Sequence, residues 1–323
     1  MKVSNKVASA LVLGALVVAG GGWTLAKRHA TAQARDLVDG FLIREGLNGR
    51  VGYADLSASP FGSVSLQGVT VTLSPDAVVR ATSVDVSDIA LQNGEIRKAR
   101  LSASGADVPV LAMARADRYN QALREMVSLG YTSLRGDVSL ALDYDDQRQS
   151  LSVETSGTVR DAGGWSARLR MEGIDPTMVA TARRLASGNF NPLELMGAAA
   201  QNMDMLFRVA LVEADVTVDN SGIRRREREI VATDLPQKQD PSGRQAAPLD
   251  PTALIRAGMA PEAARNSAAA VGAWAKDGGK LRVATGLSRP MPVFKRGAGF
   301  APILPAFDSP EGFLAVTKAT ISN

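Results

Sequence analysis

The stretch Ser63–Leu91, SVSLQGVTVTLSPDAVVRATSVDVSDIAL, alternates apolar and polar side chains in two runs, with the turn signal Ser74-Pro75 between them. Such alternation is typical of a β-strand with one buried face, whereas a helix repeats its apolar positions every three or four residues. A short turn between two alternating runs indicates an antiparallel hairpin. The stretch therefore predicts two successive half-buried strands, Ser63–Leu73 and Val78–Leu91.

The same alternation continues on both sides of this stretch, interrupted by turn signals such as Ser59-Pro60 and Asn93-Gly94. It predicts one group of strands before a short helical segment and a second group after it. The further expected strands are Tyr53–Ser57, Glu95–Ala103, Asp137–Tyr144, Ser150–Val159, Ser166–Glu172, Leu206–Val218, Lys280–Thr285 and Phe313–Ile321.

Helical spacing of apolar residues marks other segments. Strands and helices do not alternate regularly, as they would in a parallel doubly wound sheet. Their order predicts an α+β fold with a largely antiparallel sheet, which could be elongated. An N-terminal transmembrane helix precedes this sheet, and the other helices cover it. The expected helices are residues 30–47, Asp117–Leu129, Pro176 to about Leu185, Pro192 to about Asn202, and Thr252–Lys276.

Residues Val7–Ala26, VASALVLGALVVAGGGWTLA, form an uncharged run of 20 residues. At about 1.5 Å per residue, a helix of this length matches the roughly 30 Å hydrocarbon core of a bilayer. A cleaved signal peptide is the alternative, since Lys2 and Lys6 form a basic start and Ala30-Thr31-Ala32 offers a cleavage site. The length of the run and the charges of Lys27-Arg28-His29 favour an uncleaved anchor.

Positive charges are nearly balanced on the two sides of this run, so the charge rule for membrane topology decides little. A short tail followed by an apolar run usually behaves as an uncleaved export signal. We therefore expect a single-pass protein of a bacterial inner membrane, with its C-terminal part in the periplasm. The expected organisation is a cytoplasmic tail and transmembrane anchor (1–29), an amphipathic stalk helix (30–49), a β-rich periplasmic domain (50–234), a linker (235–251), and a C-terminal helix with closing strands (252–323).

Composition narrows the chemistry that the chain could carry. It has no cysteine and a single histidine, His29, which excludes disulfides, thiolate metal sites and a Ser-His-Asp triad in the domain. Its 37 Lys and Arg against 33 Asp and Glu form a mixed surface, without the basic stripe that nucleic-acid binding needs. We expect no cofactor, no metal and no nucleic-acid partner, whereas Ser-Lys or paired-carboxylate catalysis stays open.

The apolar positions of the alternating strands are candidate ligand contacts. They form either an ordinary core, which any sheet with one buried face requires, or the lining of an apolar groove. The residues of this candidate site are Val64, Leu66, Val69, Val84, Val86, Leu140 and Leu142.

A cluster of arginines is a second candidate, because guanidinium groups pair well with the phosphates of anionic lipid headgroups. Glu227 and Glu229 lie within the same cluster. They favour the alternative of a helix surface with internal ion pairs. The candidate headgroup contacts are Arg224, Arg225 and Arg226.

An acidic cluster, Asp143, Asp145 and Asp146 in DYDDQRQ, resembles half of a calcium-binding loop. The glycine and the final glutamate of such a loop are absent. Because aspartate is also a favoured turn residue, the cluster favours a solvated hairpin turn over a metal site.

The sequence also resembles known families. Within Val51–Leu91, the sequence YADLSASPFGSVSLQGVTVTLSPDAVVRATSVDVSDIAL resembles the membrane-distal repeats of AsmA-like envelope proteins. Together with GYTSLRGDVSLALDYD and LRMEGIDP further along, it is similar to the YdgA-type family of anchored bacterial envelope proteins. The resemblance covers residues 50–290 and depends on strand patterning. It implies a single-anchor protein that faces the periplasm with a β-rich groove, which in the AsmA-like group is associated with phospholipid handling. This chain departs from that group in being short.

The expected function is therefore that of a non-enzymatic, membrane-anchored envelope protein. It would bind phospholipid or another apolar segment, or act as a scaffold for other envelope proteins. One alternative is an anchored periplasmic hydrolase that uses carboxylate or Ser-Lys chemistry. Another is a component of a secretion or pilus assembly, in which the anchor and the stalk helix pair with sister subunits.

Overall fold

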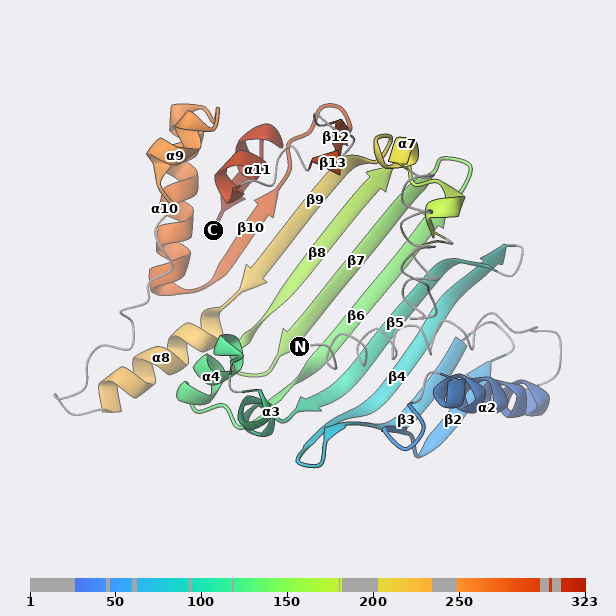
Figure 1. Ribbon diagram of the computed structural model, residues 1–323. Helices are drawn as coiled ribbons and strands as arrows, with labels where there is room; N and C mark the ends of the chain where they lie inside the picture. The colour runs from blue at the N-terminus through green and yellow to red at the C-terminus, as the bar shows by residue number, and fades with distance from the viewer. Residues whose placement is uncertain are drawn as a thin grey trace. The chain divides into compact units, whose positions relative to one another are not determined.

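The computed structural model describes residues 27–44, 47–59, 63–92, 95–117, 119–179, 181, 203–233, 249–296, 302–303 and 309–323. The described residues form two compact units. Unit 1 contains those up to Asp143 together with Thr155–Arg160, and unit 2 contains Tyr144–Glu154 together with those from Asp161 onward. Both units combine antiparallel strands with helices (Figure 1), which confirms the expected α+β class and the largely antiparallel pairing.

No helix in the described part of the chain is long and apolar enough to cross a membrane. The expected anchor, Val7–Ala26, lies outside the described residues. The same is true of the expected helix from Pro192 to about Asn202 and of positions 235–248 in the expected linker. Of the expected helix that begins at Pro176, residues 176–179 are helical.

Unit 1 is built from strands that pair with their neighbours in chain order. The opening stretch of the sequence forms two of them: Val64 lies opposite Val86, and Leu66 lies opposite Val84. All pairs of named strands in the unit are antiparallel, and the first two strands both pair with the third. The strands are β1 (Val51–Gly52), β2 (Asp55–Ser59), β3 (Ser63–Ser74), β4 (Ala77–Gln92), β5 (Glu95–Val108) and β6 (Leu134–Asp145, in this unit up to Asp143).

Three helices belong to unit 1. Helix α2 (Lys27–Arg44) lies beside β2 (Figure 1) and buries Ala34 and Val38 in a cluster with residues of β2 and β3. The expected helix Asp117–Leu129 is present as α4 (Gln121–Ser128). It begins after Asn120, whose side-chain oxygen accepts a hydrogen bond from the backbone N–H of Leu123. Helix α3 (Val110–Ala116) precedes it and was not expected.

A bulge interrupts the pairing of β5 and β6 at Gly105. The register of the two strands shifts between Ala103 and Ala106, and Gly105 has a φ of 60°. The backbone N–H of Gly105 donates a hydrogen bond to Asp137 at 2.8 Å. A Cβ at this position would lie 2.3 Å from Oγ1 of Thr82, so both the backbone angle and the available space require glycine.

Unit 2 contains a second set of antiparallel strands, and β8, β9 and β10 lie side by side in it (Figure 1). β14 pairs with the outer side of β10, and the short β11 pairs with β9. Among the strands expected here, Ser150–Val159, Ser166–Glu172 and Lys280–Thr285 are confirmed, and the strand expected over Leu206–Val218 begins at residue 210, because Leu206 is helical. The strands are β7 (Ser150–Val159, in this unit up to Glu154), β8 (Gly163–Glu172), β9 (Ala210–Asp219), β10 (Lys280–Ala284), β11 (Met291–Pro292) and β14 (Thr320–Ser322); β12 (Lys295–Arg296) pairs separately with β13 (Pro302–Ile303).

The expected single helix Thr252–Lys276 is two helices, α9 (Pro251–Arg256) and α10 (Pro261–Asp277). Gly258, between them, has a φ of 105°, which an α-helix does not accommodate. Pro261 occupies the first turn of α10, where the missing N–H of proline is tolerated. Two further helices of this unit are α7 (Met203–Leu206) and α8 (Ser221–Thr233).

The expected closing strand Phe313–Ile321 was wrong over its first half, which belongs to helix α11 (Pro310–Val316). The side chain of Ser309 accepts a hydrogen bond from the backbone N–H of Gly312, and Pro310 begins the helix. Such a cap satisfies one of the backbone donors that every helix start leaves unpaired. Only Thr320–Ser322 is a strand.

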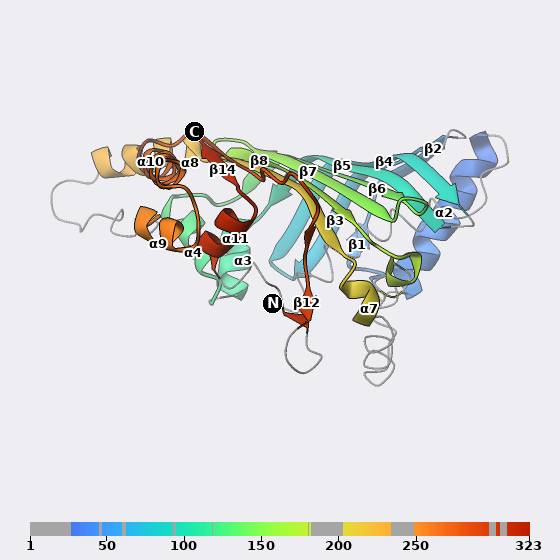
Figure 2. The same cartoon turned by 90° about the horizontal axis from the view of Figure 1, so that it is seen from above.

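The core of unit 2 is formed mainly by helices. Leu254 and Met259 are buried with Ala264 of α10 and Leu314 of α11. Val283 of β10 packs against this cluster. Figure 2 shows α9 and α11 on one side of the strands of this unit.

Candidate functional site: uncovered apolar strand faces

One face of the unit 1 strands is apolar across neighbouring strands. Leu101 of β5 lies opposite Val86 of β4 on one side and opposite Leu140 of β6 on the other. Residues directly opposite each other in antiparallel strands share one face of the sheet. The adjacent row on this face consists of Val84, Ala103 and Val138.

This face is covered over β3 and β4. Val64, Val69, Val84 and Val86, four of the expected ligand contacts, are each 6% exposed or less. Leu66 is partly buried and packs against the same clusters. These five side chains are therefore part of the core of unit 1.

The face is less covered over β6. Leu140 and Leu142, the other two expected contacts, are partly buried. Val138, in the neighbouring row, is 37% exposed. The apolar face of unit 1 thus changes from closed core at β3 and β4 to partly uncovered surface at β6.

Unit 2 has an apolar strand face of the same kind. Trp165 of β8 lies opposite Val218 of β9, and Val218 lies opposite Leu281 of β10. In the next row Val216 lies opposite Val283. Val283 packs on the helical core, whereas Trp165, Val216 and Val218 are 36%, 39% and 36% exposed. The helices of the described residues therefore leave part of the apolar face of β8 and β9 exposed.

Trp165, Val216 and Val218 were not among the expected ligand contacts. The alternation of β9 was recognised in the sequence, and Trp165 directly precedes the segment expected to form β8. Alternation identifies the apolar face of a strand, but it does not show which part of that face a helix covers. No local signal in the sequence separates Val216 from a buried valine.

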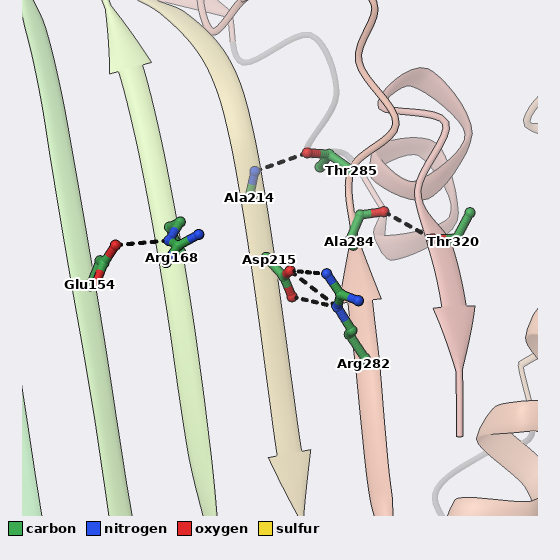
Figure 3. A network of polar contacts seen from close by, with 8 residues as sticks. All are labelled: Glu154, Arg168, Ala214, Asp215, Arg282, Ala284, Thr285 and Thr320. Carbon is green, nitrogen blue, oxygen red and sulfur yellow. Dashed lines mark hydrogen bonds and ion pairs between the residues drawn. The ribbon is translucent and has the colours of Figure 1, made fainter.

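The opposite face of the unit 2 strands carries paired charges (Figure 3). Nε of Arg168 lies 2.8 Å from Glu154 on β7. Nε of Arg282 lies 3.1 Å from both carboxylate oxygens of Asp215. The hydrogen bonds and the charge of Arg282 hold the pKa of Asp215 below its usual value. This face is therefore suited to water, in contrast to the apolar face of the same strands.

The three candidate headgroup contacts all lie on α8. Two of them, Arg224 and Arg225, form ion pairs. Nη1 of Arg224 is 2.6 Å from Glu227. Arg225 approaches Asp161 at 3.4 Å and Glu229 at 3.9 Å. Arg226 is partly buried on the same helix. The two pairs within the helix correspond to the alternative of internal ion pairs on a helix surface.

The acidic cluster forms part of the turn between β6 and β7. The carboxylate of Asp145 accepts hydrogen bonds from the backbone N–H groups of Gln147 and Arg148, each at 3.0 Å. Its other oxygen lies 3.7 Å from the guanidinium of Arg148. Across the described ranges, no group of three or more acidic, histidine or cysteine side chains is placed to hold a metal ion.

No known protein-family profile matches this chain, and a search of the curated proteins found no similar sequence.

Proposed function

We propose that this chain is a non-enzymatic envelope protein that binds the acyl chains of phospholipid on its uncovered apolar strand faces. The observation that carries the proposal is the group of Trp165, Val216 and Val218, each more than a third exposed on one face of β8 and β9. The partly uncovered face of β6 is a second surface of the same type. Contiguous exposed apolar surface is typical of interaction sites.

An acyl chain fits the chemistry of this surface. An acyl chain has no hydrogen-bonding groups. The valine side chains of the group in unit 2 offer it methyl groups, and Trp165 offers it an indole ring. Each square ångström of apolar surface removed from water contributes about 25 cal/mol. A polar ligand would lose its hydrogen bonds to water without replacement here. The ion-paired opposite face offers no comparable apolar contact.

We further propose that Val7–Ala26 anchors the chain in a bacterial inner membrane, with the described residues on the periplasmic side. Support comes from the length and the uncharged character of this segment. In that location phospholipid is the most abundant source of apolar chains. The strand patterning that resembles AsmA-like and YdgA-type envelope proteins agrees with this proposal.

Photo-crosslinking in living cells tests lipid binding with the full chain. A photoreactive phenylalanine analogue replaces Trp165 or Val216, the cells are irradiated, and the purified chain is analysed by mass spectrometry. We expect a covalent adduct with the mass of a phospholipid. The matched control is Thr217, which is next to Val216 in β9 and points to the opposite face.

Three outcomes are informative. An adduct at Val216 but not at Thr217 supports acyl-chain binding on the apolar face. Adducts of equal yield at both positions indicate non-selective contact with lipid and contradict the proposal. Adducts with protein alone favour the scaffold function over lipid binding.

Location is tested with a single introduced thiol, because the chain has no cysteine of its own. Glu262 is exposed at the start of α10. In intact cells with a permeable outer membrane, Glu262→Cys should react with a maleimide that does not cross the inner membrane. Labelling only after lysis of the cells would place the described residues on the other side.

A further inference from the structure

Strand β2 has a second side on which no described strand pairs with it. On its first side it pairs with β3, where Ser57 lies opposite Ser65. The backbone N–H of Ala58 points to the second, outer side and donates a hydrogen bond of 3.3 Å to Oγ1 of Thr31. Hydrogen-bonding directions alternate along an antiparallel strand, so the N–H and C=O groups of Leu56 face the outer side as well. The outer side of β2 therefore offers backbone groups with which a further strand can pair.

Helix α2 covers this outer side. Ala34 and Val38 of the helix are buried in one cluster with Leu56 and Ala58 of β2, and Figure 1 shows the helix beside the strand. Leu56 is 2% exposed and Ala58 is 4% exposed. A helix that covers an edge strand prevents that strand from pairing with another chain.

Polar contacts extend the cover along the strand. Arg35 lies 3.7 Å from Asp55. The phenol of Tyr53, two residues before β2, donates a hydrogen bond of 2.8 Å to Asp39. Together with the contact of Thr31, these contacts follow the helix over about two turns. The helix therefore lies along β2 from one end of the strand to the other.

The sequence of β2 itself gives little protection against pairing. Lysine and proline are the residues that most often keep an edge strand from pairing with another chain. The strand reads DLSAS, which contains neither of them, and its one charged residue is Asp55. Protection of this edge therefore depends on α2.

We infer that the outer side of β2 is a pairing surface for β2 of a second copy of this chain, and that α2 keeps this surface closed. An antiparallel pair centred on Ser57 is symmetric, because Leu56 then lies opposite Ala58 of the second copy. Both residues direct their backbone groups to the outer side, so hydrogen bonds form at both positions. Asp55 lies opposite Ser59 of the second copy, so like charges do not face each other.

The side chains of β2 also suit this pair. Residues directly opposite each other in antiparallel strands share one face of the sheet. Leu56 and Ala58 of both copies therefore lie on one face, and the polar side chains of Asp55, Ser57 and Ser59 lie on the other. The division into an apolar and a polar face continues across the pair, which a second copy provides without any change in sequence.

Disulfide formation at a single introduced thiol tests the pairing, because the chain has no cysteine of its own. The probe is Ser57→Cys, at an exposed position of β2. In the proposed pair the two Cβ atoms at position 57 lie about 5 Å apart, close to the separation that a disulfide requires. The full chain is purified in detergent micelles and oxidised in air. We expect it to stay mainly monomeric while α2 is in place.

Displacement of α2 should open the surface. Ala34→Asp combined with Val38→Asp puts two charges into a buried cluster, which disfavours the contact between helix and strand. In this background we expect the yield of the Ser57→Cys dimer to rise roughly fivefold or more, because the edge is then free to pair. Ala32→Asp is the matched control and should leave the yield unchanged, since Ala32 is exposed on the same helix.

A second variant removes the helix outright. A Gly-Ser segment of equal length replaces residues 27–44 and should give the same rise in dimer. Two other thiol positions test the register in both backgrounds. At Asp55→Cys the two thiols would lie about 13 Å apart along the paired strands, so little dimer should form. Glu262→Cys, which is exposed on α10 of unit 2, reports random collisions.

The results separate pairing from aggregation. A rise at Ser57→Cys, with low yields at Asp55→Cys and Glu262→Cys, supports the inference. A yield at Ser57→Cys that does not rise in either α2 variant overturns it, and so does an equal rise at Glu262→Cys. Loss of the strand signal in circular dichroism in both variants also overturns it, because α2 would then be required for the fold and would not be a cover.

Discussion

Val86 in unit 1 and Val216 in unit 2 occupy the same kind of place in the sequence, yet only one of them is buried. Each lies within a strand between two polar neighbours, on the apolar face. Val86 is 2% exposed and Val216 is 39% exposed. The difference teaches that the pattern of a strand determines which face is apolar, whereas the packing of other segments against that face determines which part of it is core.

The largest effect is expected where helices close the core. Leu254→Ala should lower the free energy of unfolding by about 2–5 kcal/mol, because Leu254 is fully buried and its removal leaves a cavity. Ile255→Ala is the matched control on the same helix, since Ile255 is 40% exposed. It should cost less than about 1 kcal/mol. Urea denaturation measures both, and equal losses would refute this assignment of the core.

The valine pair tests the comparison directly. Val86→Ala should cost about 2 kcal/mol, the transfer free energy of its methyl groups plus a cavity term. Val216→Ala should cost less than about 1 kcal/mol, because water already reaches this side chain. Val216→Ala should also lower the yield of the phospholipid adduct formed in cells by the photoreactive analogue at position 165. A loss of stability as large as that of Val86→Ala would show that Val216 belongs to a closed core.

The contact between α2 and the strands is sensitive to alkaline pH. Burial, together with the hydrogen bond to Asp39, raises the pKa of Tyr53 from 10.0 to about 12. The folded chain therefore keeps this proton more tightly than the unfolded chain. Its stabilising effect is present below pH 10 and is lost as the pH rises toward 12.

Tyr53→Phe removes this group and should make the stability less dependent on pH in that range. Urea denaturation at several alkaline pH values measures the slope for both chains. An unchanged slope in the variant would mean that other groups cause the alkaline loss.

The smallest effect is expected on the polar face of unit 2. Arg282 lowers the pKa of Asp215 below its usual value of 3.8, so the folded chain favours the charged carboxylate. The stabilisation is present above the usual pKa and is lost as the pH falls through the lowered value. Asp215→Asn should reduce the acid dependence of stability slightly, because the guanidinium of Arg282 is largely exposed and solvent screens the pair.

Arg282→Gln should reduce the acid dependence in the same direction, since it removes the other half of the pair. Thermal unfolding followed by circular dichroism at acidic and neutral pH compares the variants. A loss of stability as large as that of Val86→Ala would contradict a surface role for this pair.

Much of the fold could be predicted from local patterns. The strands around Ser63–Leu91 were predicted because period-two alternation is a property of consecutive residues. The helices near the C-terminus were predicted less well. Gly258 divides one expected helix, and the cap at Ser309 converts part of an expected strand into α11. Both errors arise where a single residue overrides the apolar pattern around it.

The candidate site was predicted only in kind. The expected residues lie on the apolar strand face, but Val64, Val69, Val84 and Val86 are core. The most exposed row of unit 2, which contains Trp165, was not expected. The exposure of these side chains depends on how far α9 and α11 extend over the strands. The residues of β8 and β9 give no information about that extent.

By itself, the sequence determined the antiparallel strands, the polarity of each strand face and the absence of cysteine chemistry. These properties follow from the order of neighbouring side chains and from composition. Only the tertiary structure decided which parts of the apolar faces are closed. Part of the cover comes from helices: α2 packs on β2 and on Val64 of β3, and α9 and α11 pack on Val283 of β10. Burial is a contact between distant segments, whereas alternation is a property of one segment, and only the second can be predicted from the residues of a strand alone.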